Sequence, residues 1–286
     1  MTRLAQTITR LCASSRRTFR NPYTWLVFPD EVNRTQWFTS PELISLYRTP
    51  VWDSLSERQR RVLSFWEAVN FYSLNIHGEK TLMEGVARVL YHGDFLDASD
   101  YLHHLLDEEN KHSIYFGTFC RRYAGKIYPD RKLAFPSDRA AGEETFLLFA
   151  MALIFEEIVD VYNAVMGKDD RLDPVARRIN ANHHAEETRH LRFGRELVPE
   201  LWRQAAHEWP SDTITRIRAH LEHYVRAVWR EYYNPDAYRD ASLDDPWAIQ
   251  NAAWSHPNAR RHRRTVSAGC IGFLVDSGVL EKEPVL

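Results

Sequence analysis

The sequence predicts an all-α protein, built as a four-helix bundle with additional helices around it. The chain has 286 residues, of which 44% are hydrophobic, so it can bury one sizeable core as a single domain over residues 1–286. A 13% share of aromatic residues with only 11 glycines is typical of a densely packed helical protein. Several segments repeat apolar residues at helical spacing, whereas the alternating patterns of strands and the Asn-Gly turns of hairpins are lacking.

Residues 1–40 should form an N-terminal arm. Residues 1–29 hold five arginines and no acidic residue, and Leu4, Ile8 and Leu11 follow helical spacing. This pattern favours a helix packed on the domain, although an arginine-rich segment without acids is also typical of a transit peptide. The prolines that follow predict an extended segment with one short helix.

Residues 56–200 should contain the four core helices, because the apolar period persists there over long windows. Ser56 and Gln59 form a capping pattern at the start of the first helix, and Pro174 suits the first turn of the fourth. The predicted helices cover residues 56–90, 99–124, 141–166 and 174–197. Residues 205–286 should add C-terminal helices over 213–233 and 259–275, with the basic run ARRHRR on an exposed face.

Charge and cysteine content exclude several classes of protein. A formal net charge of -2 gives no electrostatic reason to expect nucleic acid or an anionic membrane surface as a partner. Cys12, Cys120 and Cys270 lie far apart and form no CxxC pair, so neither a disulfide framework nor an iron–sulfur cluster is expected. A reducing, cytoplasmic location is therefore favoured. The longest apolar run, residues 146–155, is too short to cross a membrane.

The stretch HHAEETRH, residues 183–190, concentrates ionisable side chains on one helix. His183, Glu187 and His190 follow i, i+4 and i+7 spacing, so they share a face, and Ile179 and Leu191 lie on or beside that face. Ionisable groups on an apolar face are costly to bury without partners, and metal coordination satisfies them.

The second predicted helix repeats part of this pattern. Glu109 and His112 form a Glu-x-x-His pair, as Glu187 and His190 do in the fourth helix, and apolar residues continue their row. The helix before each pair offers a further glutamate. One is Glu79, 30 residues before Glu109. The other is residue 156 or 157, which lie 31 and 30 residues before the glutamate of the fourth helix.

One glutamate from each of two helices, with Glu-x-x-His from each of the other two, is the ligand set of carboxylate-bridged diiron sites in ferritin-like bundles. Carboxylate-rich ligation with a few imidazoles suits iron or manganese better than zinc or copper. The expected fold is therefore a ferritin-like four-helix bundle core with peripheral helices. The alternative is that these residues form surface rows, which would explain either motif alone better than the complete set.

At this point the chain resembles a known family, the diiron oxygenases typified by p-aminobenzoate N-oxygenase. The resemblance covers roughly residues 40–200 and rests on LYRTPVWDSLSERQR, HGEKTLMEG, DEENKHSIYF, FEEIVDVYNAVM and INANHHAEETRHLRFGRELV. Members of that family bind two irons through four glutamates and three histidines. The resemblance implies the following metal ligands: Glu79, Glu109, His112, Glu156, His183, Glu187 and His190.

The glutamate of the third helix is ambiguous. The family pattern favours Glu156, whereas the helical-face argument favours Glu157, which neighbours Leu153 and Val161. We choose Glu156, because a wall that faces metal ions can be polar.

Charged residues beside the ligands could orient them. Glu108 and Glu186 each precede a Glu-x-x-His glutamate, and Asp160 lies one turn after Glu156. Such carboxylates can accept the second ring N–H of a ligand histidine, and Arg189 could pair with one of them. The alternative is that Glu108, Glu186 and Arg189 are solvent-facing helix charges.

The resemblance implies a non-haem diiron monooxygenase that uses O2 to oxidise an amine nitrogen towards nitroso or nitro. The substrate would be a small aromatic or natural-product amine, and Phe71, Phe116, Leu153 and His184 are candidates to line its pocket. No flavin or nicotinamide motif is present, so a separate reductase, a ferredoxin or a small reductant must supply electrons. We expect a homodimer with no nucleic-acid or membrane partner.

Two other functions remain open at this point. A diiron C–H hydroxylase or desaturase would use the same ligands, and only its products would distinguish it. A non-enzymatic iron-binding bundle would form a ferritin-like shell and turn over metal without oxidising a substrate. The extra histidine at position 183 and the long C-terminal extension argue against such a bundle.

Overall fold

The computed structural model describes residues 3–130 and 139–286. Regular structure in these ranges is helical, and strand-like pairing is limited there to one isolated bridge between Trp37 and Leu172. The backbone N–H of Asp173 donates to the Trp37 carbonyl at 2.8 Å beside this bridge. No helix of the described ranges is long and apolar enough to cross a membrane. The all-α prediction is confirmed.

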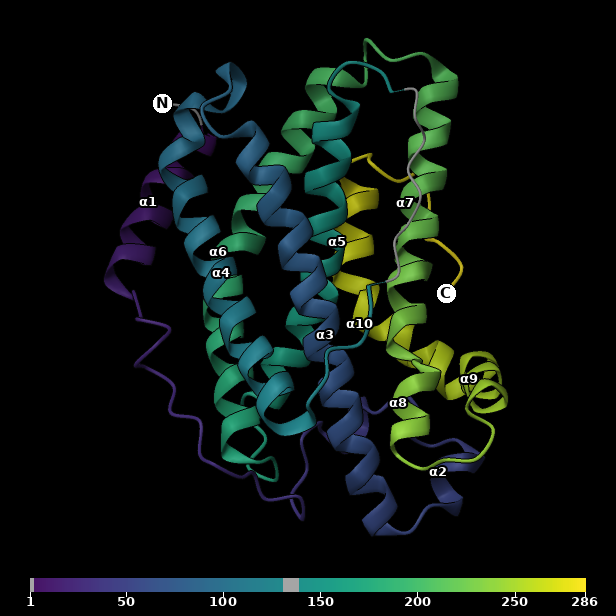
Figure 1. Cartoon of the computed structure of the whole chain (residues 1–286). Coiled ribbons are helices and arrows are strands. Elements are labelled where there is room, and N and C mark those ends of the chain that lie inside the picture. Colours follow the sequence, from purple (N-terminus) through teal and green to yellow (C-terminus); the bar gives the residue numbers. More distant parts are fainter. Residues whose placement is uncertain (1–2, 131–138) are drawn as a thin grey trace.

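Four long helices form the core of the molecule (Figure 1). They are α3 (Glu57–Val89), α4 (Ser99–Phe119), α5 (Glu143–Met166) and α6 (Pro174–Ala205). α3 packs most closely on α4, and α5 on α6, while contacts of α3 with α5 and of α4 with α6 close the bundle. The interior between the four helices is therefore where their polar rows must meet.

Local sequence explains how α3 begins and how α4 ends. Ser56 and Gln59 form the predicted capping box, in which each side chain bonds the backbone of the other. α4 continues into a single π-helical turn, η3 (Cys120–Ala124), and ends at Gly125. Gly125 has φ 69°, a left-handed conformation that glycine adopts without a steric penalty.

α6 begins as predicted but runs beyond its predicted end. The Asp173 carboxylate caps the helix by accepting from the backbone N–H of Val175 at 2.9 Å. The helix does not stop at Leu197 but continues to Ala205, because its last turns still bury apolar surface, including Trp202.

The N-terminal helix α1 (Arg3–Arg17) lies against α4 and α6. It buries Ile8 and Leu11, two of the three residues whose spacing predicted a packed helix. Residues 1 and 2 of the predicted arm lie outside the described residues.

Five short helical segments complete the periphery: η1 (Pro41–Leu43), α2 (Pro50–Ser54), η2 (Gly93–Ala98), α8 (Pro235–Asp240) and α9 (Pro246–Ser255). The sequence anticipated a short helix after the N-terminal arm but not α8 and α9. These two are too short to show a periodic pattern, although each begins with proline after a capping Asn234 or Asp245.

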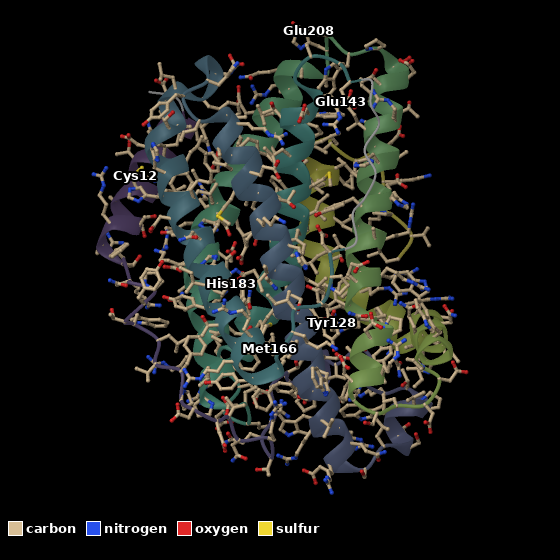
Figure 2. The ribbon with its side chains drawn as sticks, in the orientation of Figure 1. Cys12, Tyr128, Glu143, Met166, His183 and Glu208 are labelled. Atoms are coloured by element: carbon tan, nitrogen blue, oxygen red, sulfur yellow. The ribbon has the colours of Figure 1, made fainter. Side chains whose placement is uncertain are left out.

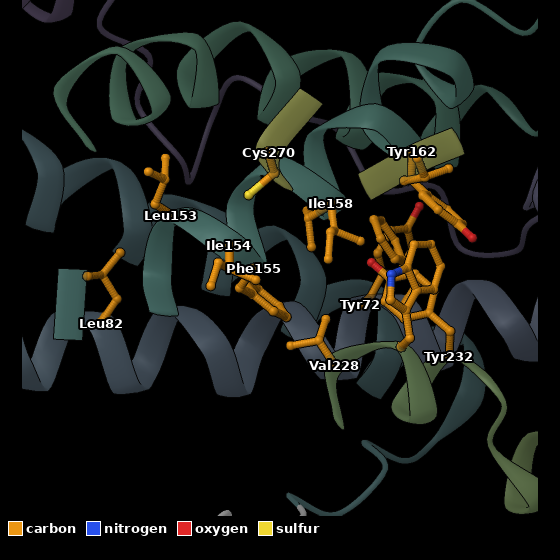
Figure 3. Packing of buried hydrophobic residues seen from close by; sticks show 14 of the residues in the cluster. Tyr72, Leu82, Leu153, Ile154, Phe155, Ile158, Tyr162, Val228, Tyr232 and Cys270 are labelled. Carbon is orange, nitrogen blue, oxygen red and sulfur yellow. The ribbon is translucent and has the colours of Figure 1, made fainter. Parts of the chain in front are cut away.

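The C-terminal helices α7 (Ser211–Tyr232) and α10 (Pro257–Asp276) pack on α5. Figure 3 shows Val228 and Tyr232 of α7 in this layer, and the Tyr232 ring lies 5.0 Å from that of Tyr162 of α5. Within the basic run, the flanking arginines are exposed as expected, but Arg263 is only 1% exposed. Its guanidinium donates to the hydroxyl of Tyr233 and the carbonyl of Trp254, which compensate for its burial.

Glu67 of α3 is a buried carboxyl group away from the polar rows. Its carboxylate accepts the backbone N–H of Ser45 at 2.9 Å and the Ser45 hydroxyl, which also contacts the Tyr238 hydroxyl at 2.7 Å. No cation is among these contacts. Burial therefore raises the pKa of Glu67 to about 7 from an ordinary value of 4.5.

We expect Glu67→Gln to change how stability depends on pH. The folded protein keeps the Glu67 proton up to about pH 7, whereas the unfolded chain loses it near pH 4.5, so the wild type loses stability as pH rises between these values. The amide cannot ionise, and the variant should escape a loss of about 3 kcal/mol. Urea unfolding at pH 5 and pH 8 measures this difference. Glu84→Gln, on the exposed face of the same helix, is the control, and identical pH profiles for all three proteins would contradict the prediction.

Candidate metal centre

Seven ionisable side chains from the four core helices meet inside the bundle, where Figure 2 places His183. Each is at most 5% exposed. α3 contributes Glu79, α4 contributes Glu109 and His112, α5 contributes Glu156, and α6 contributes His183, Glu187 and His190. Helical spacing of three and four residues directs the side chains of each helix to the same side, and the pairing of the helices directs all of them inward.

The donor atoms of these residues lie close enough to share metal ions. Donor atoms of Glu109, His112, Glu187 and His190 lie within 4.8 Å of one another. Donor atoms of Glu79, His112 and His183 lie within the same distance of one another. So do those of Glu156, His183 and Glu187. The Glu187 carboxylate belongs to two of these sets, so its position suits a ligand that bridges two ions.

Several buried donor atoms in the cluster form no well-directed hydrogen bond with the described residues, although some of them lie 3.0–3.4 Å from another member of the cluster. They are Glu79 Oε1, both carboxylate oxygens of Glu109, His112 Nδ1, Glu156 Oε2 and His183 Nε2. A buried polar atom without a partner costs about 1–3 kcal/mol, and more when it is charged. Metal ions at the centre of the cluster would bind all of these atoms, so the residues present fit such ions.

The carboxyl groups of the cluster differ in how firmly they hold protons. Burial raises the pKa of Glu79 and of Glu156 well above the ordinary range. Burial would also raise the pKa of Glu187, but the attraction of His190 and His183 outweighs burial and holds this pKa well below the ordinary range. Burial would raise the pKa of Glu109 too, but attraction to His190 and His112 outweighs burial and lowers it. Metal ions that enter must therefore displace protons from Glu79 and Glu156.

Two of the histidines are oriented by carboxylates from the opposite helix. His112 Nε2 lies 2.9 Å from Glu186 Oε2, and His190 Nε2 lies 2.9 Å from Glu108 Oε2. Both rings therefore turn Nδ1 toward the cluster; for His190 it lies 3.0 Å from Glu109 Oε1. Such contacts fix ring orientation and make the other nitrogen a stronger ligand.

Buried cations hold these two orienting carboxylates. Arg189 Nη2 lies 2.7 Å from Glu108 Oε1, and Lys111 Nζ lies 3.4 Å from Glu186 Oε1. Lys111 is only 1% exposed, and Asp107 is its second partner at 3.0 Å. α4 reads EENKH over residues 108–112, and α6 reads EETRH over residues 186–190. The histidine and the cation of each motif contact the first glutamate of the other motif.

The third histidine has a neutral partner instead. His183 Nδ1 contacts the side-chain amide of Asn163, and its Nε2 lies 3.0 Å from Glu187 Oε1. The contacting atom is Asn163 Nδ2, and its Oδ1 has no hydrogen-bond partner. Exchanging the two ends of this amide would let Nδ1–H donate to the oxygen and leave Nε2 to bind metal. Asp160, expected to orient a ligand, lies 2.7 Å from His184 Nδ1 instead, because its carboxylate points toward the half-buried side of α6.

The two candidate glutamates of α5, Glu156 and Glu157, have different surroundings in the structure. Glu156 lies with His183 and Glu187 inside the cluster, whereas Glu157 forms an ion pair with Arg195, at 2.8 Å for Nη2. We carry Glu156 forward as the proposed ligand.

A family model for "P-aminobenzoate N-oxygenase AurF" matches residues 2–278 of the chain. The chain belongs to the AurF family. It is an oxygenase with a four-helix bundle core and a buried carboxylate–histidine site. A search of curated proteins found no match.

Solved structures similar to this AurF-family chain are R2-like ligand-binding oxidases. One is a variant with an anaerobically reconstituted Mn/Fe cofactor, at 14% identity and a TM-score of 0.46 over 91% of this chain and 92% of that one. Another is an R2-like ligand-binding oxidase without metal cofactor, at 14% identity and a TM-score of 0.45 over 91% and 96% of the two chains.

Several residues around the cluster of this AurF-family chain were not anticipated from the sequence. Nothing in the sequence distinguishes Lys111 and Asn163 from ordinary helix residues. The same is true of Ser113, whose hydroxyl donates to Glu79 Oε2 at 2.9 Å. Asn182 donates to Glu186 Oε2 at 3.0 Å and is itself held by Arg20. Only the repeated pattern Glu-Glu-x-cation-His could have singled out Lys111.

An apolar cavity of about 30 Å³ lies beside the cluster, with Glu156 and His190 as its polar walls. Of the four residues proposed to line a substrate pocket, only Leu153 lines this cavity. Phe116 instead packs edge-on against the His183 ring at 5.0 Å. Phe71 stacks on another aromatic ring, and His184 bonds Asp160, so these two serve packing and charge pairing.

We expect Glu156→Ala to lower the metal content of the AurF-family chain after anaerobic reconstitution, because it removes a ligand. Glu157→Ala is the matched control on the next residue, since it breaks only the ion pair with Arg195. Elemental analysis of both variants, with circular dichroism to verify helix content, measures the difference. Loss of metal in Glu157→Ala alone would move the ligand by one residue.

Lys111→Met should weaken metal binding roughly 10–100-fold, because Glu186 would lose the buried cation that balances its charge. Lys111→Arg keeps that charge and should restore most of the affinity. Anaerobic titration of each variant with Co²⁺, followed by visible absorption, reports affinity and coordination geometry together. Equal affinities in all three proteins would show that Glu186 orients His112 without this cation.

Proposed function

We propose that the chain binds two iron ions through its seven clustered residues and uses dioxygen to oxidise an amine nitrogen of a small aromatic substrate. The observation that carries this proposal is the convergence of four glutamates and three histidines whose donor atoms face one another, several of them without a hydrogen bond. Membership of the AurF family supports oxidation at nitrogen, the activity for which that family is described.

The donor set favours iron over softer metals. Its ligands are carboxylates and imidazoles without a thiolate, a set that suits iron or manganese. Four ionised glutamates carry four negative charges, which two divalent cations balance. Without the ions, burial raises the pKa values of Glu79 and Glu156, and repulsion from the neighbouring carboxylates adds to this rise.

When bound, the two irons supply the redox chemistry that activates dioxygen. The protein residues hold this centre in place, since Glu108 and Glu186 fix the rings of His190 and His112. The apolar walls of the adjacent cavity keep water from the polar cluster. Electrons must come from outside the chain, for which we propose a separate reductase or ferredoxin.

The cavity beside Glu156 and His190 is the route by which small reactants reach the cluster. Its 30 Å³ is room for a molecule of about the size of water or dioxygen. An aromatic amine requires side chains to move, and half-buried Leu191 and Ala152 are the wall residues nearest to solvent.

One observation favours a second function, oxidation of a C–H bond. The cavity walls other than Glu156 and His190 are apolar or glycine, so no further side chain offers an amine a hydrogen bond. An apolar carbon chain would fit such walls equally well. Product analysis with an amine and an alkyl substrate distinguishes the two reactions.

The proposal is tested by anaerobic loading with Fe(II), iron analysis, and rapid mixing with dioxygen while visible absorption is recorded. We expect two irons per chain and an absorption change that depends on dioxygen. p-Aminobenzoate with a chemical reductant should then give a product whose mass has increased by oxygen.

Glu109→Ala is the control, because it removes a carboxylate at the centre of the cluster without touching the cavity walls. It should retain helix content but lose the iron and the response to dioxygen. One iron or none in the wild type would refute the diiron proposal. Two irons with an unchanged amine and an oxidised alkyl probe would favour the second function.

A further inference from the structure

A second pocket, of about 200 Å³, lies at the surface away from the metal cluster. It is formed by the segment between η1 and α2, by Tyr233, and by the first turns of α10. None of the seven clustered residues lines it. In Figure 1, α2, α8 and α9 gather toward the same end of the molecule, beside the start of α10.

Arg48 lines this pocket and has an unusual backbone conformation. Its φ is 56°, in the left-handed region that glycine and asparagine adopt more readily than arginine. The side-chain amide of Asn258 donates to the Arg48 carbonyl at 2.8 Å and holds the turn in place. A long cationic side chain is thus kept where a smaller residue would be less strained, and such strain is typical of residues retained for function.

The pocket has positive charge that the protein does not neutralise. Arg48 and Arg261 both line it, and neither guanidinium forms an ion pair with a described residue. The one acidic lining residue, Glu42, is held by Arg171 through two contacts of 3.0 and 2.7 Å. Burial, with help from Arg263, lowers the pKa of His262 to about 4, so it adds no charge at neutral pH.

The rest of the lining suits a flat apolar group. Tyr47 and Ile44 form one wall, and the Arg48 guanidinium lies 5.2 Å from the centre of the Tyr47 ring. His262 Nε2 is engaged by the Tyr162 hydroxyl at 2.8 Å, which fixes the ring at the pocket wall. A molecule with a carboxylate for the guanidinium groups and a ring for the tyrosine would satisfy both features.

We propose that this pocket binds a small organic acid with an aromatic or apolar part, at a site separate from the metal centre. The geometry of a guanidinium allows two parallel hydrogen bonds to one carboxylate, and the negative charge of the carboxylate strengthens both, whereas a neutral hydroxyl offers a single oxygen and no charge. The ligand is therefore recognised by its carboxylate, while its ring contributes contact area against Tyr47.

The test is calorimetric titration of the full-length iron-loaded protein with benzoate, with benzyl alcohol as the same ring without a carboxylate. Benzoate should bind and benzyl alcohol should not. Arg48→Met and Arg261→Met should each weaken benzoate at least 10-fold. Arg264→Met is the matched control, since Arg264 is exposed on the same helix but does not line the pocket, and it should bind as the wild type does.

Arg48→Gly separates binding from folding. It relieves the left-handed strain, so the variant should unfold at an equal or higher urea concentration than the wild type while losing benzoate. A clear loss of stability would show that Arg48 serves the fold, and would overturn the inference. So would an absence of benzoate binding, or equal binding in Arg48→Met, Arg261→Met and the wild type.

The metal centre provides an internal check. Glu109→Ala should still bind benzoate, because the two sites share no lining residue. Loss of benzoate in that variant would place the ligand on the metal ions and overturn the inference. Normal iron loading of Arg48→Met and Arg261→Met would show that their loss of benzoate is independent of the proposed oxygenase activity.

Discussion

The structure depends on one electrostatic constraint: four carboxyl groups and three imidazoles are buried together at the centre of an apolar bundle. Without compensation, burial alone would make this arrangement strongly unfavourable. The protein relieves part of it by keeping protons on Glu79 and Glu156, and part by pairing Glu187 and Glu109 with histidines. The rest of the cost of burial comes from donor atoms that form no hydrogen bond, and a bound metal ion would remove it. Stability and metal binding are therefore linked through the same atoms.

The contacts between α4 and α6 make this constraint specific. Glu186 and Glu108 each reach across to the other helix and hold its histidine, while Lys111 and Arg189 neutralise them. Sliding one helix past the other would break both carboxylate–histidine contacts together and would separate Lys111 and Arg189 from their carboxylate partners on the other helix. These contacts of Glu186 and Glu108 therefore set the register of α4 and α6, and the register sets the geometry of the metal-binding atoms.

Helical periodicity predicted the core helices and the inward rows from the sequence, because both depend on spacing within one segment. It could not predict which side chains meet across helices. Asp160 was expected to orient a ligand histidine, but Asn163, one turn further along α5, contacts His183. The choice between Glu156 and Glu157 was equally open to pattern analysis, since apolar neighbours favoured the residue that pairs with Arg195 at the edge of the bundle. Such questions are decided by the rotation of a helix about its axis, which only packing fixes.

The two halves of the cluster differ in a way that assigns them different roles. Each of the two carboxyl groups has one oxygen without a hydrogen bond to a described residue, Glu79 Oε1 and Glu156 Oε2, and Ser113 donates to the other oxygen of Glu79 at 2.9 Å. Glu156 also lines the apolar cavity, and Glu79 does not. A carboxyl group beside a cavity is the first that an incoming molecule meets. We therefore infer that dioxygen and substrate approach from the Glu156 side, while Glu79 and Ser113 keep the opposite side fixed.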